Sequence, residues 1–163
     1  VKETYANKDF IVGYRLSPEE AESPGISMER TEKLIKTITK KAIDYVHISI
    51  MDIHSKTREG KYEGEERLKL IHQWVDGRMP VIGIGSVFTA DDALDAVEST
   101  GIELVALGRG ILLDYNFINK IEEGKEEEII SYFDPNREDK HALPPNLWEQ
   151  FNKGFYPLPR KDK

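Results

Sequence analysis

Four short apolar segments, each followed by a helical pattern, constrain the fold of this chain more than any other feature. The segments lie at residues 10–16, 43–50, 81–85 and 104–108. Strands that alternate with amphipathic helices are typical of βαβ units, in which neighbouring strands run parallel. The sequence therefore predicts an α/β fold with about four parallel strands, joined in chain order by helices.

The helices are predicted from apolar positions that share one face. Residues 29–42 and 65–76 carry such a face, and a third helix has Ala90, Ala93, Leu94 and Val97 at the i, i+3, i+4, i+7 spacing. A shorter fourth helix is expected from Phe117, ending before Gly124. At the start of the third helix, Thr89 and Asp92 have the spacing of a capping box.

The strands alternate between aliphatic side chains and small or polar ones, so the two faces of the sheet should differ. In the third strand, Ile82 and Ile84 are expected on the aliphatic face, and Gly83 and Gly85 on the small and polar face. A sheet covered by helices on both sides tends to be apolar on both faces. This asymmetry favours a barrel whose mouth holds a ligand. The aliphatic set in the first two strands comprises Val12, Tyr14, Leu16, Val46, Ile48 and Ile50.

The length of the chain, 163 residues, indicates only part of such a barrel. A complete (β/α)₈ TIM barrel needs about 250 residues, so four units amount to half of one. A half-barrel exposes two parallel strand edges, which invite pairing. We expect either a missing N-terminal half-barrel or a second copy of this chain as the partner. The strand close to Val1 favours the former and makes this the C-terminal half.

The last part of the chain differs in composition. Residues 134–163 contain five prolines and two short aromatic clusters, around Trp148 and Phe155. Side chains this apolar are unfavourable in water, so a floppy tail is the weaker alternative. We expect two regions: a half-barrel over residues 1–133, and a C-terminal arm over 134–163, packed on the barrel or on a partner chain. Trp148 and Phe151 should be buried.

Charge and cysteine content narrow the partners. The formal net charge is −7, which argues against nucleic acid or an anionic membrane as the main partner, since both attract cationic surfaces. The absence of cysteine excludes disulfides, thiolate metal sites and cysteine nucleophiles, and no metal site is predicted. No apolar run approaches the roughly 20 residues of a membrane span. A cytoplasmic location and a small-molecule substrate are expected.

Glycines and polar residues follow the last two predicted strands. Gly85 and Ser86 follow the third, and Gly108 and Arg109 follow the fourth. Glycine lets the backbone approach an anion, and arginine offers a planar pair of donors. In barrels of this kind the phosphate site usually lies in the loops after the last two strands. The sequence predicts a phosphate site here, and tight-turn glycines without a ligand are the alternative.

Four motifs carry a resemblance to a known family. They are VGYRLSP, DYVHIS, PVIGIGSV and LVALGRGILLD, and they lie between residues 10 and 124. In this order they resemble the final four strand signatures of the old yellow enzyme family, FMN-dependent oxidoreductases built on a (β/α)₈ barrel. The resemblance implies that the full-length parent transfers a hydride from NADH or NADPH to FMN and then to an activated alkene or similar acceptor.

The resemblance also implies roles for five residues. Arg15 resembles the arginine that contacts the pyrimidine edge of the flavin, whereas Gly85, Ser86, Gly108 and Arg109 resemble the residues that hold the FMN phosphate. A cation at the pyrimidine edge stabilises the negative charge that appears on reduction. The alternative for Arg15 is a structural ion pair with a nearby carboxylate, such as Glu19 or Glu20.

The substrate-binding His/His or His/Asn pair of the family and its usual tyrosine proton donor belong to the barrel's first half. The chain has no HxxH or HxxN motif, so its catalytic residues are unknown; His47, His54, His72 and His141 are not assigned to that pair. His47 is expected to be a packed, hydrogen-bonded inner residue. His54 and Arg58 are expected to lie in a solvated loop over residues 51–64, and contact of these two side chains with a nicotinamide or a substrate is the alternative. The isolated chain should bind FMN weakly or not at all, and should not turn over NAD(P)H.

Two function classes stay open. The first is a fragment of an FMN-dependent NAD(P)H oxidoreductase, which carries the phosphate site and is inactive alone. The second is a non-catalytic, self-associating half-barrel that binds phosphate or a nucleotide. A Schiff-base aldolase has no support, because no lysine lies inside a predicted strand.

Overall fold

The computed structural model describes residues 9–22 and 24–161, which form two compact units. Unit 1 comprises the described part of Val1–Gly85 together with Asp95–Ala106. Unit 2 comprises Ser86–Leu94 and the described part of Leu107–Lys163. The ends of the two predicted regions, residues 1–8 and 162–163, lie outside the described residues, and the division after residue 133 stays a prediction.

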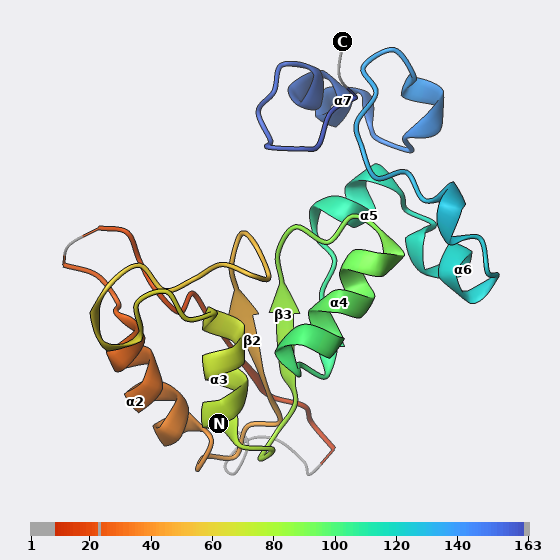
Figure 1. The fold of residues 1–163 in the computed structure, drawn as a ribbon. Helices are drawn as coiled ribbons and strands as arrows, with labels where there is room; N and C mark the ends of the chain where they lie inside the picture. The colour runs from red at the N-terminus through yellow and green to blue at the C-terminus, as the bar shows by residue number, and fades with distance from the viewer. Residues whose placement is uncertain (1–8, 23, 162–163) are drawn as a thin grey trace. The chain divides into compact units, whose positions relative to one another are not determined.

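A sheet of parallel strands forms the centre of unit 1. Its strands are β1 (Gly13–Leu16), β2 (Tyr45–Ser49), β3 (Val81–Ile84) and β4 (Leu104–Val105). They are ordered β1-β2-β3-β4, and each neighbouring pair is parallel. Figure 1 labels the two central strands, β2 and β3. This order confirms the predicted α/β class with parallel strands joined in chain order.

The strands are shorter than predicted. β1 begins at Gly13 rather than at Phe10, and β4 has only two residues. The predicted end of the fourth strand is instead used by a helix, since Gly108 is the N-cap of α5 (Arg109–Leu113). A short apolar pattern does not show how many of its residues make ladder hydrogen bonds.

The helices of unit 1 lie close to the predicted positions. They are α2 (Met28–Ile38) and α3 (Arg67–Val75), which contact each other beside β2 and β3 (Figure 1). A single turn of 3₁₀ helix, η1 (Gly60–Tyr62), lies in the loop before α3. The core of unit 1 contains aliphatic side chains that are almost completely buried: Ile35, Val46, Ile48, Leu68, Ile71, Val75 and Val81.

One predicted strand face is wrong. The register aligns Ile48 of β2 with Gly83 of β3, and His47 with Ile82, so Gly83 lies on the aliphatic face and Ile82 on the other. A Cβ added at Gly83 would lie 2.7 Å from Ile102 Cδ1 and 3.1 Å from Leu68 Cδ1. The glycine therefore makes room for core side chains. A glycine has no side chain whose polarity could indicate a face, so the alternation of polar and apolar residues did not predict that Gly83 is buried.

The helix α4 (Ala90–Thr100) begins as predicted. The Asp92 amide donates to Thr89 Oγ1 at 3.1 Å, and the Thr89 amide donates to Asp92 Oδ2 at 2.9 Å. This reciprocal pair confirms the capping box, which satisfies amides that the first helical turn leaves without partners.

Unit 2 is built from short helices around an aromatic cluster. Besides α5, it contains α6 (Phe117–Glu122) and α7 (Pro145–Asn152), and the 3₁₀ turns η2 (Glu126–Glu128) and η3 (Glu138–Lys140). The aromatic cluster consists of Leu113, Phe133, Trp148 and Phe151, which are all buried. The burial predicted for Trp148 and Phe151 is confirmed, whereas the helix α7 within the arm was not predicted.

A buried ion pair orders the chain between α5 and α7. Lys120 Nζ donates to Asp114 Oδ2 at 2.5 Å, and the same oxygen accepts the Ile130 amide at 2.9 Å. The Asn116 amide donates to Asp114 Oδ1 at 3.0 Å. Burial alone would raise the pKa of Asp114, but the hydrogen bonds from Lys120 and these amides outweigh it and hold the pKa below its usual value.

Candidate functional site

The residues that follow β3 and β4 meet in unit 2. Ser86 comes two residues after the end of β3, and Arg109 begins α5 after β4. Arg109 Nη2 donates a hydrogen bond to Ser86 Oγ at 3.0 Å. The sequence expected these two loops to lie side by side, and the structure brings their polar side chains into direct contact. That the backbone amides of the two loops converge on one anion stays a prediction.

Two further groups hold the Arg109 guanidinium. Its Nη1 donates to the carbonyl oxygen of Pro157 at 2.7 Å, and its Cζ lies 5.2 Å from the centre of the Phe88 ring. Sequence reasoning missed both. Phe88 follows Ser86 by two residues and could have been included with that loop, whereas Pro157 is 48 residues away from Arg109 and nothing in the sequence connects them.

Gly85, the last residue before the chain enters unit 2, and Ser86, the first residue of unit 2, both have backbone conformations that few residue types adopt. Ser86 has a φ of 52°, a left-handed conformation that non-glycine residues adopt rarely. In unit 1, a Cβ at Gly85 would lie 2.7 Å from the backbone nitrogen of Asp52, and the Gly85 carbonyl accepts the Ile53 amide at 3.3 Å. The close approach of the loop after β2 therefore explains the glycine at position 85 without a ligand.

The loop after β4 shows a similar close approach. Gly108 is the N-cap of α5, and the next glycine, Gly110, lies buried in the first turn of that helix. A Cβ at Gly110 would lie 2.5 Å from the carbonyl oxygen of Val87. The absence of a side chain at Gly110 thus allows α5 to approach the residues that follow Ser86.

The chemistry of this group of residues suits an anion. A guanidinium is always charged and offers several N–H donors in one plane, and a serine hydroxyl can donate as well as accept. Together with a glycine N-cap, this donor set matches the oxygen-rich surface of a phosphate. In the described part of the chain no cluster of His, Asp or Glu could hold a metal ion.

Arg15 lies in unit 1, on the sheet face opposite the aliphatic core. It pairs in register with His47, and its Nη2 donates to Ser49 Oγ at 2.7 Å. The alternative considered for Arg15 was an ion pair with Glu19 or Glu20. Glu19 instead forms a buried ion pair with Arg67, and the Glu20 carboxylate accepts the Ile26 amide at 2.9 Å.

His47 is half-buried beside Arg15, as its predicted packed position implies. Burial lowers the pKa of His47, and the positive charge of Arg15 lowers it further. The imidazole is therefore neutral at pH 7. Its Nε2 is buried and has no hydrogen-bond partner among the described residues, so the hydrogen bond expected for this histidine is not made at Nε2.

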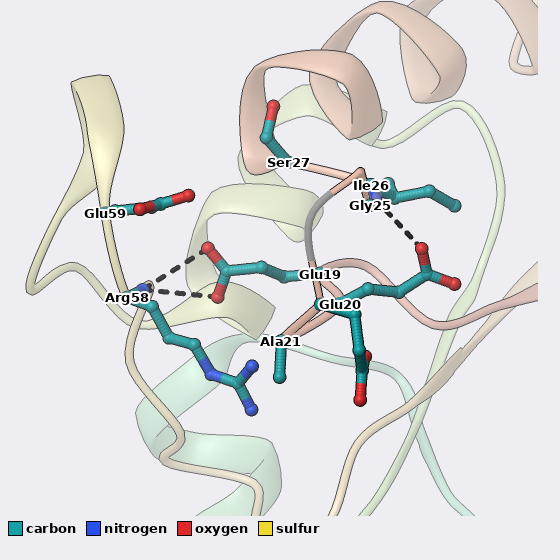
Figure 2. A pocket seen from close by; sticks show the side chains of 9 residues that line it. Glu19, Glu20, Ala21, Gly25, Ile26, Ser27, Arg58 and Glu59 are labelled. Atoms are coloured by element: carbon teal, nitrogen blue, oxygen red, sulfur yellow. Dashed lines mark hydrogen bonds between the residues drawn. The ribbon is translucent and has the colours of Figure 1, made fainter.

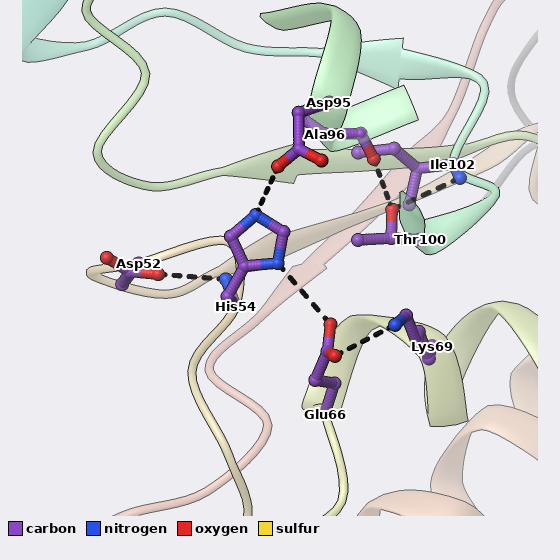
Figure 3. A network of polar contacts seen from close by, with 8 residues as sticks. All are labelled: Asp52, His54, Glu66, Lys69, Asp95, Ala96, Thr100 and Ile102. Carbon is purple, nitrogen blue, oxygen red and sulfur yellow. Dashed lines mark hydrogen bonds and ion pairs between the residues drawn. The ribbon is translucent and has the colours of Figure 1, made fainter. Parts of the chain in front are cut away.

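The loop after β2, which was predicted to be solvated, is held in place by side-chain contacts of His54. His54 Nε2 lies 2.6 Å from Asp95 Oδ2, and its Nδ1 lies 3.4 Å from Glu66 Oε2, as Figure 3 shows. Burial would lower the pKa of His54, but the hydrogen bonds to Asp95 and Glu66 raise it overall. Both imidazole nitrogens face carboxylates, so this histidine joins the loop to α3 and α4.

Glu19 holds the other end of the same loop. Both of its carboxylate oxygens accept the backbone amide of Arg58, at 3.3 and 3.2 Å, so the amide rather than the guanidinium makes this contact (Figure 2). The pocket beside it is lined by nine residues, four of which are glutamates: Glu19, Glu20, Glu22 and Glu59. Its acidic lining is unsuited to a phosphate.

The remaining histidines have local partners. His72 Nε2 lies 3.3 Å from Glu103 Oε1. His141 is buried in unit 2, where its Nδ1 lies 3.1 Å from the carbonyl oxygen of Leu113 and its Nε2 accepts the Asp134 amide at 3.3 Å. Neither forms a pair with another histidine or an asparagine.

No helix among the described residues is both long enough and apolar enough to span a membrane.

The residues predicted to hold a ligand lie in two units, each with its own buried core. Arg15 and Gly85 belong to unit 1, and Ser86, Gly108 and Arg109 belong to unit 2.

Comparison with known proteins places the chain in a family. Residues 1–128 match the model of the NADH:flavin oxidoreductase / NADH oxidase family. The chain is 42% identical over 158 residues to the probable NADH-dependent flavin oxidoreductase YqiG of Bacillus subtilis, covering 97% of this chain and 42% of that protein. It is 32% identical over 155 residues to the NADH:acrylate oxidoreductase of Vibrio harveyi, covering 91% of this chain and 15% of that protein.

A solved structure agrees on the fold. Histamine dehydrogenase from Rhizobium sp. 4-9 superposes with a TM-score of 0.58 at 20% identity, covering 73% of this chain and 18% of that one. The chain spans less than half the length of the curated relatives cited here, and its parallel strands and helices are consistent with part of a barrel. On the match over residues 1–128, the chain belongs to the NADH:flavin oxidoreductase / NADH oxidase family.

Proposed function

We propose that this chain is the C-terminal half-barrel of an FMN-dependent NAD(P)H oxidoreductase, and that Gly85, Ser86, Gly108 and Arg109 hold the FMN phosphate. The observation that carries the proposal is the hydrogen bond from Arg109 Nη2 to Ser86 Oγ, 3.0 Å long. It joins the loops after β3 and β4, which are the loops expected to bind phosphate in such a barrel.

The family match supports FMN as the cofactor and NADH as the electron donor. The family description and the name of the Bacillus subtilis relative both specify NADH and flavin. The Vibrio harveyi relative is named for acrylate, an activated alkene, which supports a small acceptor of that class. Because the chain covers 42% of the Bacillus subtilis relative, we assign the activity to a longer protein, of which this chain is a fragment.

A second role is proposed for Arg15. FMN, when bound, supplies the ring that accepts the hydride. A guanidinium near the pyrimidine edge of that ring favours the reduced, more negative form. The neighbouring His47 is neutral at pH 7 because burial and Arg15 lower its pKa, so Arg15 supplies the positive charge of this register pair.

The substrate-binding pair of histidines is proposed to lie outside this chain. His54, His72 and His141 each have partners that fix them in the structure of their own unit. His47 has no second histidine or asparagine beside it in the register of the sheet. These contacts support the proposal that this chain contributes the phosphate site, while the substrate-binding pair lies elsewhere in the protein.

The partner that completes the barrel is proposed to be the missing N-terminal half. On the sheet face opposite the core, Tyr45, His47 and Ile82 are only half-buried, and Leu104 is 51% exposed. Partly exposed apolar side chains such as those of Ile82 and Leu104 are stabilised when another layer covers them. A second copy of this chain is the alternative partner, and it would require self-association of the isolated chain.

The test uses the protein expressed from the complete coding frame that contains this chain. Dissociation constants for FMN and riboflavin are measured by quenching of flavin fluorescence. Loss of a charged hydrogen-bond donor at a phosphate typically weakens binding about 10- to 100-fold. Arg109→Ala should therefore weaken FMN binding by about that factor and leave riboflavin binding unchanged. An equal loss for both flavins would contradict the phosphate assignment.

The matched control is Arg137→Ala, which removes an arginine of the same unit whose ion pair with Asp139 lies on the surface. It should leave both dissociation constants unchanged. In the same preparation NADH should bleach the flavin absorbance. The isolated chain should show neither tight FMN binding nor NADH oxidation, and a yellow, active preparation of the isolated chain would contradict the fragment assignment.

A further inference from the structure

We propose that the C-terminal segment of residues 156–161, here called the C-terminal clasp, is part of the phosphate site, and that Arg160 is its positioning residue. This inference rests on the proposed function. It assigns a binding role to a part of the chain beyond residues 1–128, the region matched by the family model.

The clasp fixes the orientation of Arg109. The Pro157 carbonyl accepts a hydrogen bond from Arg109 Nη1 at 2.7 Å, while Ser86 Oγ accepts one from Nη2 at 3.0 Å. The Phe88 ring lies against the same guanidinium. Because the guanidinium is planar, two bonds from its two terminal nitrogens and one ring contact determine its plane. A cation held in this way is ordered before a phosphate arrives.

Backbone pairing holds the clasp to the aromatic cluster. The Phe133 amide donates to the Pro159 carbonyl at 2.7 Å, and the Lys161 amide donates to the Phe133 carbonyl at 3.2 Å. These bonds form a parallel bridge between Phe133 and Arg160. Phe133 is completely buried, so the bridge connects the clasp to the core of unit 2.

Arg160 adds a second connection, to the end of α7. Its Nη1 donates to the Phe151 carbonyl at 2.8 Å and its Nη2 to the Asn152 carbonyl at 3.3 Å. These are among the last carbonyls of a helix, which have no partner within the helix. The guanidinium also lies over the Phe133 ring, 5.2 Å from its centre. The Phe151 carbonyl also accepts the Gly154 amide at 3.0 Å, so Arg160 adds donors to the helix end and fixes the path of the clasp.

Ordering of the Arg109 side chain before binding affects the affinity for the phosphate. Pro157 is exposed, so its carbonyl is held in place by its neighbours in the clasp rather than by burial. Without Arg160 the carbonyl would be less fixed, and Arg109 would have to be ordered by the phosphate itself. Ordering a long side chain costs enough free energy to weaken binding by about three- to ten-fold.

The first experiment measures flavin selectivity in the protein from the complete coding frame. Arg160→Ala should weaken FMN binding by about three- to ten-fold and leave riboflavin binding unchanged, since the two ligands differ only in the phosphate. Arg160→Lys keeps the charge but loses the planar pair of donors, so it should give a smaller loss. Arg137→Ala is the control and should change neither ligand.

The outcomes separate this inference from the proposed function. An FMN-selective loss in Arg109→Ala but none in Arg160→Ala would overturn the clasp and leave the proposed function standing. The absence of a selective loss in both variants would overturn both. A loss for both flavins in a folded Arg160→Ala protein would reduce Arg160 to a purely structural role, and would also overturn the clasp.

A second experiment uses the unsubstituted protein, so it decides the question if Arg160→Ala does not fold. Hydrogen exchange is followed at the Phe133 and Lys161 amides with saturating FMN or riboflavin. Coupling between sites is reciprocal, so FMN should slow exchange at these amides about three- to ten-fold more than riboflavin does. The His141 amide, which donates to the Glu138 carbonyl, should respond equally to both. Equal protection of all three amides by both flavins would overturn the clasp.

Discussion

Units 1 and 2 are stabilised by different kinds of interaction. In unit 1, the register of a parallel sheet places aliphatic side chains such as Val46 and Ile48 in a core where they are fully buried. In unit 2, short helices surround a few aromatic rings, and single side chains such as Asp114 and Arg160 bind the backbone of distant segments. The repeated interactions of unit 1 support one another, whereas those of unit 2 depend on particular residues.

This difference has a consequence for binding. The side chains proposed to hold the phosphate, Ser86 and Arg109, belong to unit 2. Their geometry depends on Phe88, on Pro157 and on the segments that hold Pro157. Binding should therefore respond to substitutions in the C-terminal region that touch no ligand, while substitutions in the core of unit 1 should act through stability.

The chain has two tryptophans, and each reports on one unit. Trp74 lies in α3 of unit 1, where its ring is 5.1 Å from that of Tyr62. Trp148 lies in α7 of unit 2, with its ring 4.7 Å from that of Phe133. Variants that keep only one of them, Trp74→Phe or Trp148→Phe, allow the unfolding of the two units to be followed separately.

The largest effect is expected for Phe133→Ala. Removal of a completely buried phenylalanine at the centre of the aromatic cluster should cost about 3–5 kcal/mol of unfolding free energy. In denaturant titrations the Trp148 transition should shift to lower concentration more than the Trp74 transition. Phe155→Ala, at a position that is 71% exposed, is the control. Equal shifts of both transitions would mean that the units unfold as one.

A smaller effect, dependent on pH, is expected for Asp114→Asn. The loss of charged hydrogen bonds to Lys120 and to two amides should cost about 1.5–3 kcal/mol at pH 7. The folded pKa of Asp114 is below its ordinary value, so its ionised form stabilises unit 2 above about pH 4, and this contribution is lost as the pH falls through the folded pKa. The difference in unfolding free energy from the parent should therefore narrow in acid. A constant difference between pH 7 and pH 3 would contradict this account.

Gly85→Ala tests the close approach in unit 1. The new Cβ would lie 2.7 Å from the Asp52 nitrogen, so backbone must move, at a cost of about 1–3 kcal/mol. Gly64→Ala, in the same unit, has positive φ but nothing within 4 Å of the new Cβ, and should cost about 1 kcal/mol. The midpoint of the Trp74 transition measures both. An equal cost for the two variants would show that the approach to Asp52 is unimportant for stability.

The smallest effect is expected at His54. Burial lowers its pKa, but the hydrogen bonds to Asp95 and Glu66 raise it overall, so its protonated form stabilises unit 1 below about pH 6.5. This contribution is lost as the pH rises through the raised, folded pKa. Because the side chain is 46% exposed, Asp95→Asn should lower stability by only a few tenths of a kcal/mol near pH 5.5, and by less near pH 9. A larger loss at the higher pH would reverse the sign.

The sequence predicted unit 1 better than unit 2 for a physical reason. The parallel strands and the helices α2 and α3 follow from apolar residues that repeat at the period of each element. The predicted strand face was wrong at a glycine: Gly83 faces the core because Ile102 fills the space a side chain would take. A glycine in a strand has no side chain, so the sequence alone does not show which face of the sheet it lies on.

In the candidate site, the sequence anticipated the loops but not their supports. Ser86 and Arg109 follow consecutive strands, and strand ends of a parallel sheet meet at one edge, so their proximity was predictable. The Pro157 carbonyl is a backbone group, present at every residue, and therefore leaves no trace in the sequence. The Arg160 contacts join segments that only the folded unit brings together.

The most direct test of the central claim is a double-mutant cycle between Ser86 and Arg109. In the protein from the complete coding frame, the ratio of FMN to riboflavin dissociation constants is measured for Ser86→Ala, Arg109→Ala and the double variant. Groups that contact each other and one ligand should be coupled by about 0.5–3 kcal/mol, so the double variant should lose clearly less FMN selectivity than the two single losses combined. Independent losses that simply multiply, or equal losses for FMN and riboflavin, would contradict the claim that these two loops form one phosphate site.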